Sequence, residues 1–152
     1  MSKNSVIAVD PGYDRVGIAV FKDEKLVHSE CYVPPKGEFA VRLKFVYHRI
    51  TTVLRAHKPR SLALETLYFS KNQKTAIRVA EARGIIELAA AEAGIPVFEY
   101  SPQAVKIAVT GSGNAPKDAV IRMVDRLLSL PKKKRVDDEY DAIALGMALR
   151  GG

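Results

Sequence analysis

Three short apolar runs open the chain, and polar connections separate them. The runs cover residues 5–10, 16–21 and 26–33, and the connections are residues 11–15 and 22–25. Runs of this length, rich in Val and Ile and bounded by turn residues, are typical of strands. Because the connections are short, the three strands are predicted to pair as an antiparallel meander.

A helical period replaces the strand pattern after Pro34-Pro35-Lys36-Gly37. The predicted helix covers residues 38–57 and ends at Lys58-Pro59. Apolar side chains recur along it at helical spacing and would form one buried stripe. The stripe consists of Phe39, Leu43, Val46, Ile50, Val53 and Leu54.

Residues 61–65 form the next apolar run and are predicted as a buried strand that ends on Glu65. A linker at residues 66–71 follows, and a long Ala-rich helix is then predicted over residues 73–93, closed by Gly94. Small side chains along this helix would let a second helix approach closely, which suits a dimer contact as well as packing against the sheet. They are Ala76, Ala80, Gly84, Ala89, Ala90 and Ala91.

The last third of the chain is mostly helical. A short strand is predicted at residues 95–99, and Ser101-Pro102 begins a helix with an N-cap and a proline at its first position. A flexible loop at residues 110–114 precedes a helix that starts at Pro116, and the final helix begins near Asp138. We expect the basic run of residues 132–135 to be exposed, and the side chains of Val120, Val124, Leu127 and Leu128 to face inward.

This order of elements predicts an α/β fold. The sheet is mixed and five-stranded, an antiparallel meander plus parallel strands, with helices on both faces. Residues 1–152 are enough for a single domain with a proper core. In such sheets, sites lie at the carboxyl ends of the parallel strands. Asp10 and Glu65 each end a predicted strand, so they meet at one edge if their strands are parallel neighbours.

Composition narrows the class of partner. The chain has 24 Lys and Arg against 17 Asp and Glu, a net charge of +7, which favours nucleic acid first and an anionic membrane second. Cys31 is the single cysteine, so one chain can form neither a disulfide nor a Cys-based zinc site, as suits a reducing compartment. No signal pattern or membrane-spanning run occurs. We therefore expect a cytoplasmic protein without a membrane partner.

Each acid has a simple interpretation when it is taken alone. Asp10 precedes Pro-Gly, where an Asp commonly forms a turn by bonding its own backbone. Asp138 and Asp141 share a face of the last helix, where acids in a first turn stabilise the helix dipole. Asp137 with Asp141 is also a same-face pair. The dipole does not explain why Asp141 leads directly into the apolar run of residues 142–145.

Four carboxylates could not share a site as bare anions, because like charges raise one another's pKa. A divalent cation with oxygen ligands removes this conflict, and Mg²⁺, or Mn²⁺ in its place, is the usual choice for phosphodiester chemistry. Two ions about 4 Å apart would activate a water and stabilise the leaving oxygen. The acids therefore point to a magnesium site.

Six short motifs follow one another at compatible spacing. They are Asp10-Pro11-Gly12 with Gly17; Glu65-x-x-Tyr68-Phe69-x-x-Asn72; Ala82-Arg83-Gly84; Tyr100-Ser101-Pro102-x-x-Val105-Lys106; Thr110-Gly111-x-Gly113-x-x-x-Lys117; and Asp138-x-x-Asp141-Ala142. In this order they resemble the RuvC family of Holliday-junction resolvases, which have a ribonuclease-H-like fold. The resemblance covers nearly the whole chain.

The resemblance implies a homodimeric, Mg²⁺-dependent endonuclease that nicks two strands of a four-way DNA junction symmetrically, in recombination and repair, with a branch-migration motor as a possible partner. Its implied metal-binding and catalytic acids are Asp10, Glu65, Asp138 and Asp141; the family spacing selects Asp138 over Asp137. Its implied DNA-binding residues are Lys106 and Lys117 near the site and Tyr68, with the adjacent Phe69, in the linker. Lys71 flanks these aromatic residues and is a DNA-binding candidate by its charge, with an ordinary charged helix start as the alternative. Tyr68 stands where the family usually has a Phe that acts on bases at the junction centre, and a Tyr keeps that stacking ring.

The chain also departs from the family pattern. Ala19 replaces a common Gly, and Glu139-Tyr140 replaces a pair of small residues between the last two acids. Two other functions stay open. One is a catalytically silent junction-binding protein, against which the four intact acids argue. The other is an ATPase of the actin-like superfamily, whose strand–turn motif also carries Asp-x-Gly but whose members have two such domains.

Overall fold

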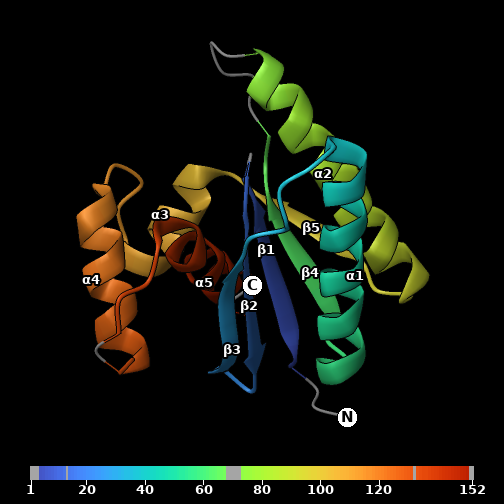
Figure 1. The fold of residues 1–152 in the computed structure, drawn as a ribbon. Helices are drawn as coiled ribbons and strands as arrows, with labels where there is room; N and C mark the ends of the chain where they lie inside the picture. The colour runs from blue at the N-terminus through green and yellow to red at the C-terminus, as the bar shows by residue number, and fades with distance from the viewer. Residues whose placement is uncertain (1–3, 13, 68–72, 132, 151–152) are drawn as a thin grey trace.

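A five-stranded mixed sheet forms the centre of the protein (Figure 1). The computed structural model describes residues 4–12, 14–67, 73–131 and 133–150. The strands are β1 (Val6–Pro11), β2 (Val16–Lys22), β3 (Lys25–Tyr32), β4 (Ser61–Glu65) and β5 (Val97–Tyr100). Their order is β3-β2-β1-β4-β5, with antiparallel pairing from β1 to β3 and parallel pairing of β4 with both β1 and β5. The predicted mixed sheet is confirmed, and its strand bounds were predicted to within two residues.

Helices cover both faces of the sheet, as predicted (Figure 1). One face carries α1 (Phe39–His57) and α2 (Gln73–Glu92), and the other carries α3 (Pro102–Thr110), α4 (Lys117–Leu128) and α5 (Asp137–Arg150). The predicted N-cap of α3 is present, since the hydroxyl of Ser101 accepts a hydrogen bond from the Ala104 amide at 3.0 Å. No helix within the described ranges has both the length and the apolar character that a membrane span requires.

The two faces of the sheet carry side chains of different size. On β1, β2 and β4, the alternate side chains that point to one face of the sheet are large and pack against α1 and α2. They are Ile7, Val9, Ile18, Val20, Leu62 and Leu64. The side chains that point to the opposite face lie under α5, and several of them are small: Ala8, Ala19 and Ala63. The unusual Ala19 is fully buried on this face, so a small residue is retained where the family commonly has Gly.

Helix α5 lies unusually close to the sheet because two glycines lack a side chain. A Cβ at Gly17 would overlap the carbonyl oxygen of Asp138 and lie 3.3 Å from the Cβ of Ala142. A Cβ at Gly146, two turns further along α5, would overlap the ring of Phe21. These two approaches fix the height of α5 above β2 at both ends of the helix.

Two expectations about side-chain exposure are wrong. Leu127 is 53% exposed, whereas Val124 is buried and Val120 and Leu128 are partly buried, so Leu127 lies outside the face of α4 that packs on the core. The basic run after α4 is not uniformly exposed either. The Arg135 side chain is only 5% exposed, and its Nε lies 3.5 Å from Oε2 of the buried Glu139.

The contact at Gly17 makes a prediction about stability. Gly17→Ala forces either β2 or the first turn of α5 to move, so we expect the free energy of unfolding to fall by about 2 kcal/mol or more. Chemical denaturation followed by circular dichroism measures this change. Gly113→Ala is the matched control, because its Cβ would meet Ile107 at an ordinary 3.5 Å. Equal stability of the two variants would contradict the close approach of α5.

Candidate active site

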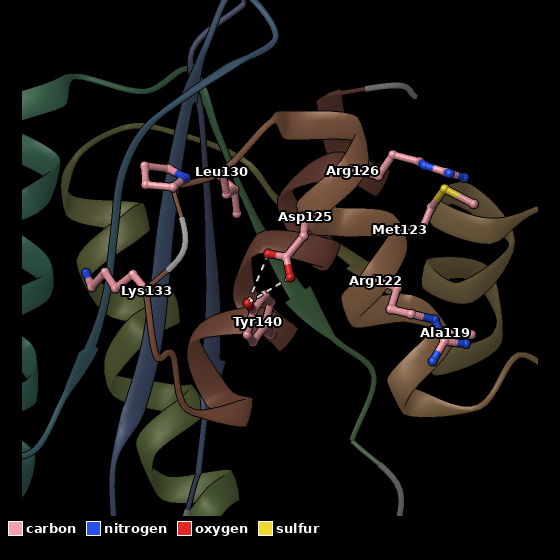
Figure 2. Close-up of a pocket in the computed structure, with 9 residues that line it drawn as sticks. Ala119, Arg122, Met123, Asp125, Arg126, Leu130, Lys133 and Tyr140 are labelled. Atoms are coloured by element: carbon pink, nitrogen blue, oxygen red, sulfur yellow. Dashed lines mark hydrogen bonds between the residues drawn. The ribbon is translucent and has the colours of Figure 1, made fainter.

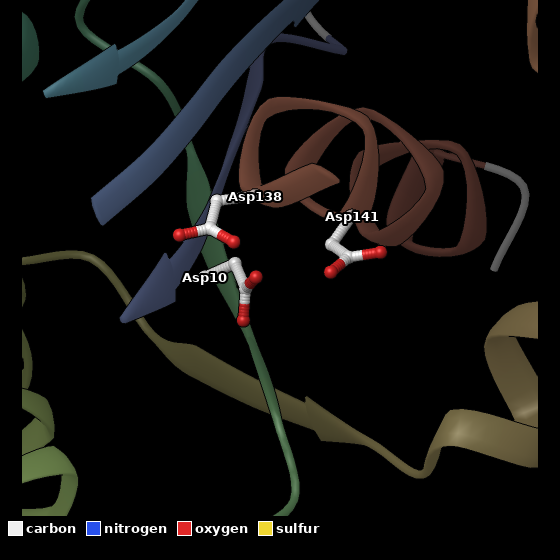
Figure 3. A group of neighbouring side chains, drawn as sticks. All are labelled: Asp10, Asp138 and Asp141. Atoms are coloured by element: carbon white, nitrogen blue, oxygen red, sulfur yellow. The ribbon is translucent and has the colours of Figure 1, made fainter. Parts of the chain in front are cut away.

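Three carboxylates meet at the carboxyl end of β1 (Figure 3). Asp10 projects from β1, and Asp138 and Asp141 project from the first turns of α5. Each offers a carboxylate oxygen within 4.8 Å of the other two. Segments more than 120 residues apart in sequence therefore supply one cluster of oxygen atoms.

The fold brings these acids together in two steps. Asp10 lies two residues after Ala8 on β1, so its side chain points to the same face of the sheet, the one that α5 covers. Its cross-strand partner is Gly17, over which the main chain of Asp138 sits. The missing side chain at Gly17 thus allows the first turn of α5 to reach Asp10 directly.

Asp138 rather than Asp137 joins the cluster. Helical spacing in the sequence allows either residue, because both share a face with Asp141. The side chain of Asp138 is 19% exposed, whereas that of Asp137 is 63% exposed. Asp137 instead lies 3.7 Å from the ammonium group of Lys117. The acids of α5 that face β1 are therefore Asp138 and Asp141.

Two basic side chains pair with different members of the cluster. Nε of Arg15 donates a hydrogen bond to Oδ2 of Asp138 at 2.8 Å. Nζ of Lys117 donates to Oδ2 of Asp141 at 3.1 Å. Lys117 was expected close to the site, whereas no sequence pattern placed Arg15 there.

Burial and mutual repulsion perturb the cluster strongly. Burial, followed by the negative charges of Asp141, Glu65 and Asp138, raises the pKa of Asp10 from 3.8 to about 8. The pKa of Asp141 is also raised, mainly by burial and against the opposing effect of Lys117. Arg15 and Lys117 therefore neutralise the site incompletely, and it retains an affinity for further positive charge.

Glu65 lies beside the cluster without joining the group of three. Strands β1 and β4 are parallel with Val9 opposite Leu64, so Asp10 and Glu65 follow at the same edge of the sheet. Burial and then the charge of Asp141 raise the pKa of Glu65. The predicted meeting of two strand-terminal acids at one sheet edge is thus observed.

Lys106 and Lys117, the two lysines expected near the site, lie with Glu65 and Asp141 around one hollow. This hollow measures about 270 Å³ and is formed where α3 and the start of α4 approach the edge of the sheet. The positive charges of both lysines lower the pKa of Glu65 and so oppose the increase that burial causes. The other DNA-binding candidates, Tyr68, Phe69 and Lys71, lie outside the described residues.

Arg83 explains the Ala82-Arg83-Gly84 motif, for which the sequence suggested no role. Its side chain is 9% exposed, and its guanidinium donates to the main-chain carbonyl of Glu65 and to the carboxylate of Glu99. Arg83 therefore connects α2 to the ends of β4 and β5. It holds the backbone of Glu65 and leaves the Glu65 carboxylate to face the site.

The two large residues between the helical acids brace the first turn of α5 from other sides. Oε2 of Glu139 accepts a hydrogen bond from the hydroxyl of Ser29 on β3 at 2.7 Å. The hydroxyl of Tyr140 donates to the carboxylate of Asp125 on α4 at 3.0 Å, beside a hollow between α4 and the segment that follows it (Figure 2). The departure from small residues thus provides extra anchors for Asp138 and Asp141.

The donor set fits a hard divalent cation. All of the clustered donors are carboxylate oxygens, which suit Mg²⁺, Mn²⁺ and Ca²⁺ and offer none of the nitrogen or sulfur ligands that zinc and copper prefer. The raised pKa of Asp10 supports this assignment, because a bound cation would favour the ionised carboxylate against the burial and the neighbouring negative charges that raise it.

Comparisons with known proteins place the chain in one family. Residues 6–149 match the family model described as Crossover junction endodeoxyribonuclease RuvC. The enzyme of that name from Moorella thermoacetica is 42% identical, covering 93% of this chain and 88% of the relative. Its counterpart from Pseudothermotoga lettingae is 40% identical, covering 92% and 90%. A solved structure of T. thermophilus RuvC in complex with Holliday junction substrate superposes with a TM-score of 0.86 at 32% identity, covering 95% of this chain and 91% of that one. The chain belongs to the RuvC family of crossover junction endodeoxyribonucleases.

Proposed function

We propose that this protein is a structure-selective endonuclease that resolves four-way DNA junctions by paired symmetric nicks, in recombination and repair. The observation that carries the proposal is the cluster of Asp10, Asp138 and Asp141, whose oxygens lie within 4.8 Å of one another in a chain of this family. The reaction is hydrolysis of a phosphodiester bond. Residues 1–152 act as a single nuclease domain.

Asp10, Asp138 and Asp141, with Glu65 beside them, would hold the divalent cation, for which we propose Mg²⁺ with Mn²⁺ as a substitute. When bound, such a cation lowers the pKa of a water and stabilises the leaving oxygen. The protein's own contribution is to keep the acids in register through Gly17 and Arg83. Lys106 and Lys117 line the same hollow and supply positive charge to the backbone phosphates.

Junction DNA is the substrate that best fits the charge and the family. The net charge of +7 favours a polyanion, and the T. thermophilus relative was solved with a Holliday junction. The connection between β4 and α2 begins directly after Glu65, so its Tyr68, Phe69 and Lys71 are proposed to contact bases and phosphates next to the cut. A branch-migration motor is proposed as a further partner, and the cytoplasm as the location.

The outward face of α2 supports the proposed homodimer. Its inward face packs on the sheet through Ile86, Ala89 and Ala90. The opposite face presents an apolar stripe at helical spacing, in which Ile77 is 55% and Leu88 52% exposed. Between and beyond these two, the stripe contains the exposed small residues Ala80, Gly84 and Ala91. Small residues of this kind allow close helix–helix contact, and two symmetric nicks require two active sites.

The alternative function is a silent junction-binding protein with the same fold. A cleavage assay on synthetic four-way, flap and linear DNA separates the two proposals. We expect Mg²⁺-dependent nicking of the four-way junction in preference to the other two. Tight junction binding with no cleavage in Mg²⁺ or Mn²⁺ would instead establish the silent protein.

Asp10→Asn tests the acid cluster. The change keeps the shape of the side chain and removes one anionic ligand, so we expect junction cleavage to fall by more than about 100-fold. Junction binding should be unchanged or tighter, because one negative charge near the phosphate is lost. Asp118→Asn, at a side chain that is 69% exposed on α4, is the control with the same change of charge. Wild-type cleavage by Asp10→Asn would show that Asp10 only forms a turn.

The pKa of Asp10 predicts a pH dependence of stability. Without divalent cations the folded carboxyl has a pKa of about 8 against 3.8 in the unfolded chain, so between these values folding takes up a proton. The free energy of unfolding therefore falls as pH rises through this window. We expect the difference in Tm between Asp10→Asn and wild type, measured in EDTA, to grow from about pH 5 to about pH 8. A difference that is constant with pH would contradict the raised pKa.

The dimer contact is tested by Leu88→Glu. A carboxylate in the apolar stripe of α2 cannot be buried without a partner, so we expect the protein to become monomeric and paired nicking to be lost. Light scattering coupled to size exclusion measures the mass. Leu127→Glu is the matched control, since Leu127 is equally exposed, at 53%, on a different helix. A dimeric Leu88→Glu variant would remove this face of α2 from the interface.

A further inference from the structure

Arg15 occupies an unusual place at the edge of the acid cluster. It lies in the connection between β1 and β2, where the amide of Gly12 donates to the carbonyl of Arg15 at 2.8 Å and closes a tight turn. This turn brings the Arg15 side chain back over α5, and its Nε reaches Oδ2 of Asp138. A Cβ at Gly12 would lie 3.2 Å from the same Oδ2, so Gly12 also lies close to the Asp138 carboxylate.

The exposed fractions of the Arg15 and Asp138 side chains show how their ion pair lies relative to the solvent. The Asp138 side chain is 19% exposed and that of Arg15 is 44% exposed, so the ion pair runs from the cluster out to the solvent. The contact to Asp138 uses Nε, and the two terminal nitrogens of Arg15 form no hydrogen bond with another described residue. A guanidinium fork of this kind matches two oxygens of a phosphate.

Arg15 and Lys117 act on different acids. Lys117 pairs with Asp141 and lines the hollow that also contains Glu65 and Lys106. Arg15 pairs with Asp138 and is part of the β1–β2 connection. A DNA strand whose phosphate lies at the three acids would therefore meet positive charge from two separate elements of the fold.

We propose that Arg15 is a further substrate-binding residue, which contacts a DNA phosphate beside the cut and competes through its charge with the divalent cation at Asp138. This inference rests on the proposed nuclease function. It follows that Arg15 strengthens binding of DNA and weakens binding of the cation in the absence of DNA. A residue that only holds Asp138 in place would have the opposite effect on the cation.

Arg15→Gln tests both consequences. In calorimetric titration with Mn²⁺ and no DNA, we expect its Kd to fall by about two- to fivefold, the size of effect that a partly exposed ion pair has. In junction binding with Ca²⁺ in place of Mg²⁺, we expect weaker affinity and a slope of log K against log salt that is smaller by about one. Arg15→Lys keeps the charge, so its Mn²⁺ affinity should stay near that of wild type.

Arg122→Gln is the control, because Arg122 is an exposed arginine on α4 that pairs with an exposed Asp118. We expect it to leave both Mn²⁺ affinity and the salt slope within about 20% of wild type. Weaker or unchanged Mn²⁺ binding by Arg15→Gln would overturn the competition, and an unchanged salt slope would remove Arg15 from the DNA. Neither result bears on the nuclease function itself, which junction cleavage by the wild-type protein tests independently.

Discussion

The close packing of α5 on the sheet is the constraint on which the active site depends. Small residues line the face of the sheet beneath this helix, and Gly17 lies where the first turn must come nearest. The same turn carries Asp138 and Asp141, so the height of the helix decides whether their oxygens reach Asp10. Ser29 and Asp125, which bind Glu139 and Tyr140, hold that turn from β3 and α4. A packing contact between main-chain atoms thus sets the spacing of the ligands.

This packing has an electrostatic cost. The pKa of Asp10 is raised so far because its carboxyl group is buried and, after that, because the neighbouring carboxylates repel its charge. Arg15 and Lys117 offset part of that repulsion without removing it. The fold tolerates the remainder because the rest of the core is well packed, and the uncompensated charge is what gives the site its affinity for cations.

Much of the fold and of the site followed from local patterns in the sequence. Apolar runs that end on an acid placed Asp10 and Glu65 at strand ends, and the apolar run that follows Asp141 indicated that this acid faces inward. The choice between Asp137 and Asp138 was beyond those patterns, because both share a face with Asp141 and only the approach of α5 to Gly17 distinguishes them. The spacing of the family's motif selected Asp138, which helical spacing alone could not do.

The errors have a common physical cause, which is that burial depends on distant partners. Arg135 was expected to be exposed because it ends a basic run, yet Glu139 and the packing of α5 bury it. Leu127 and Leu128 are adjacent and equally apolar, and only the position of α4 against the core decides which one is covered. Arg15 and Arg83 carry no local signal of their role, since each acts on an acid that another element of the fold supplies.

Arg83 connects the helix of the proposed dimer contact to the active site. It belongs to α2, whose outer face is the proposed dimer contact, and it binds the main chain of Glu65 at the active site. In the dimer, the two sites would therefore be connected through a pair of helices and two buried guanidinium groups. The separation of the two cuts on the DNA would then be a fixed length built into the rigid centre of the enzyme, against which a flexible junction must adjust its own arms.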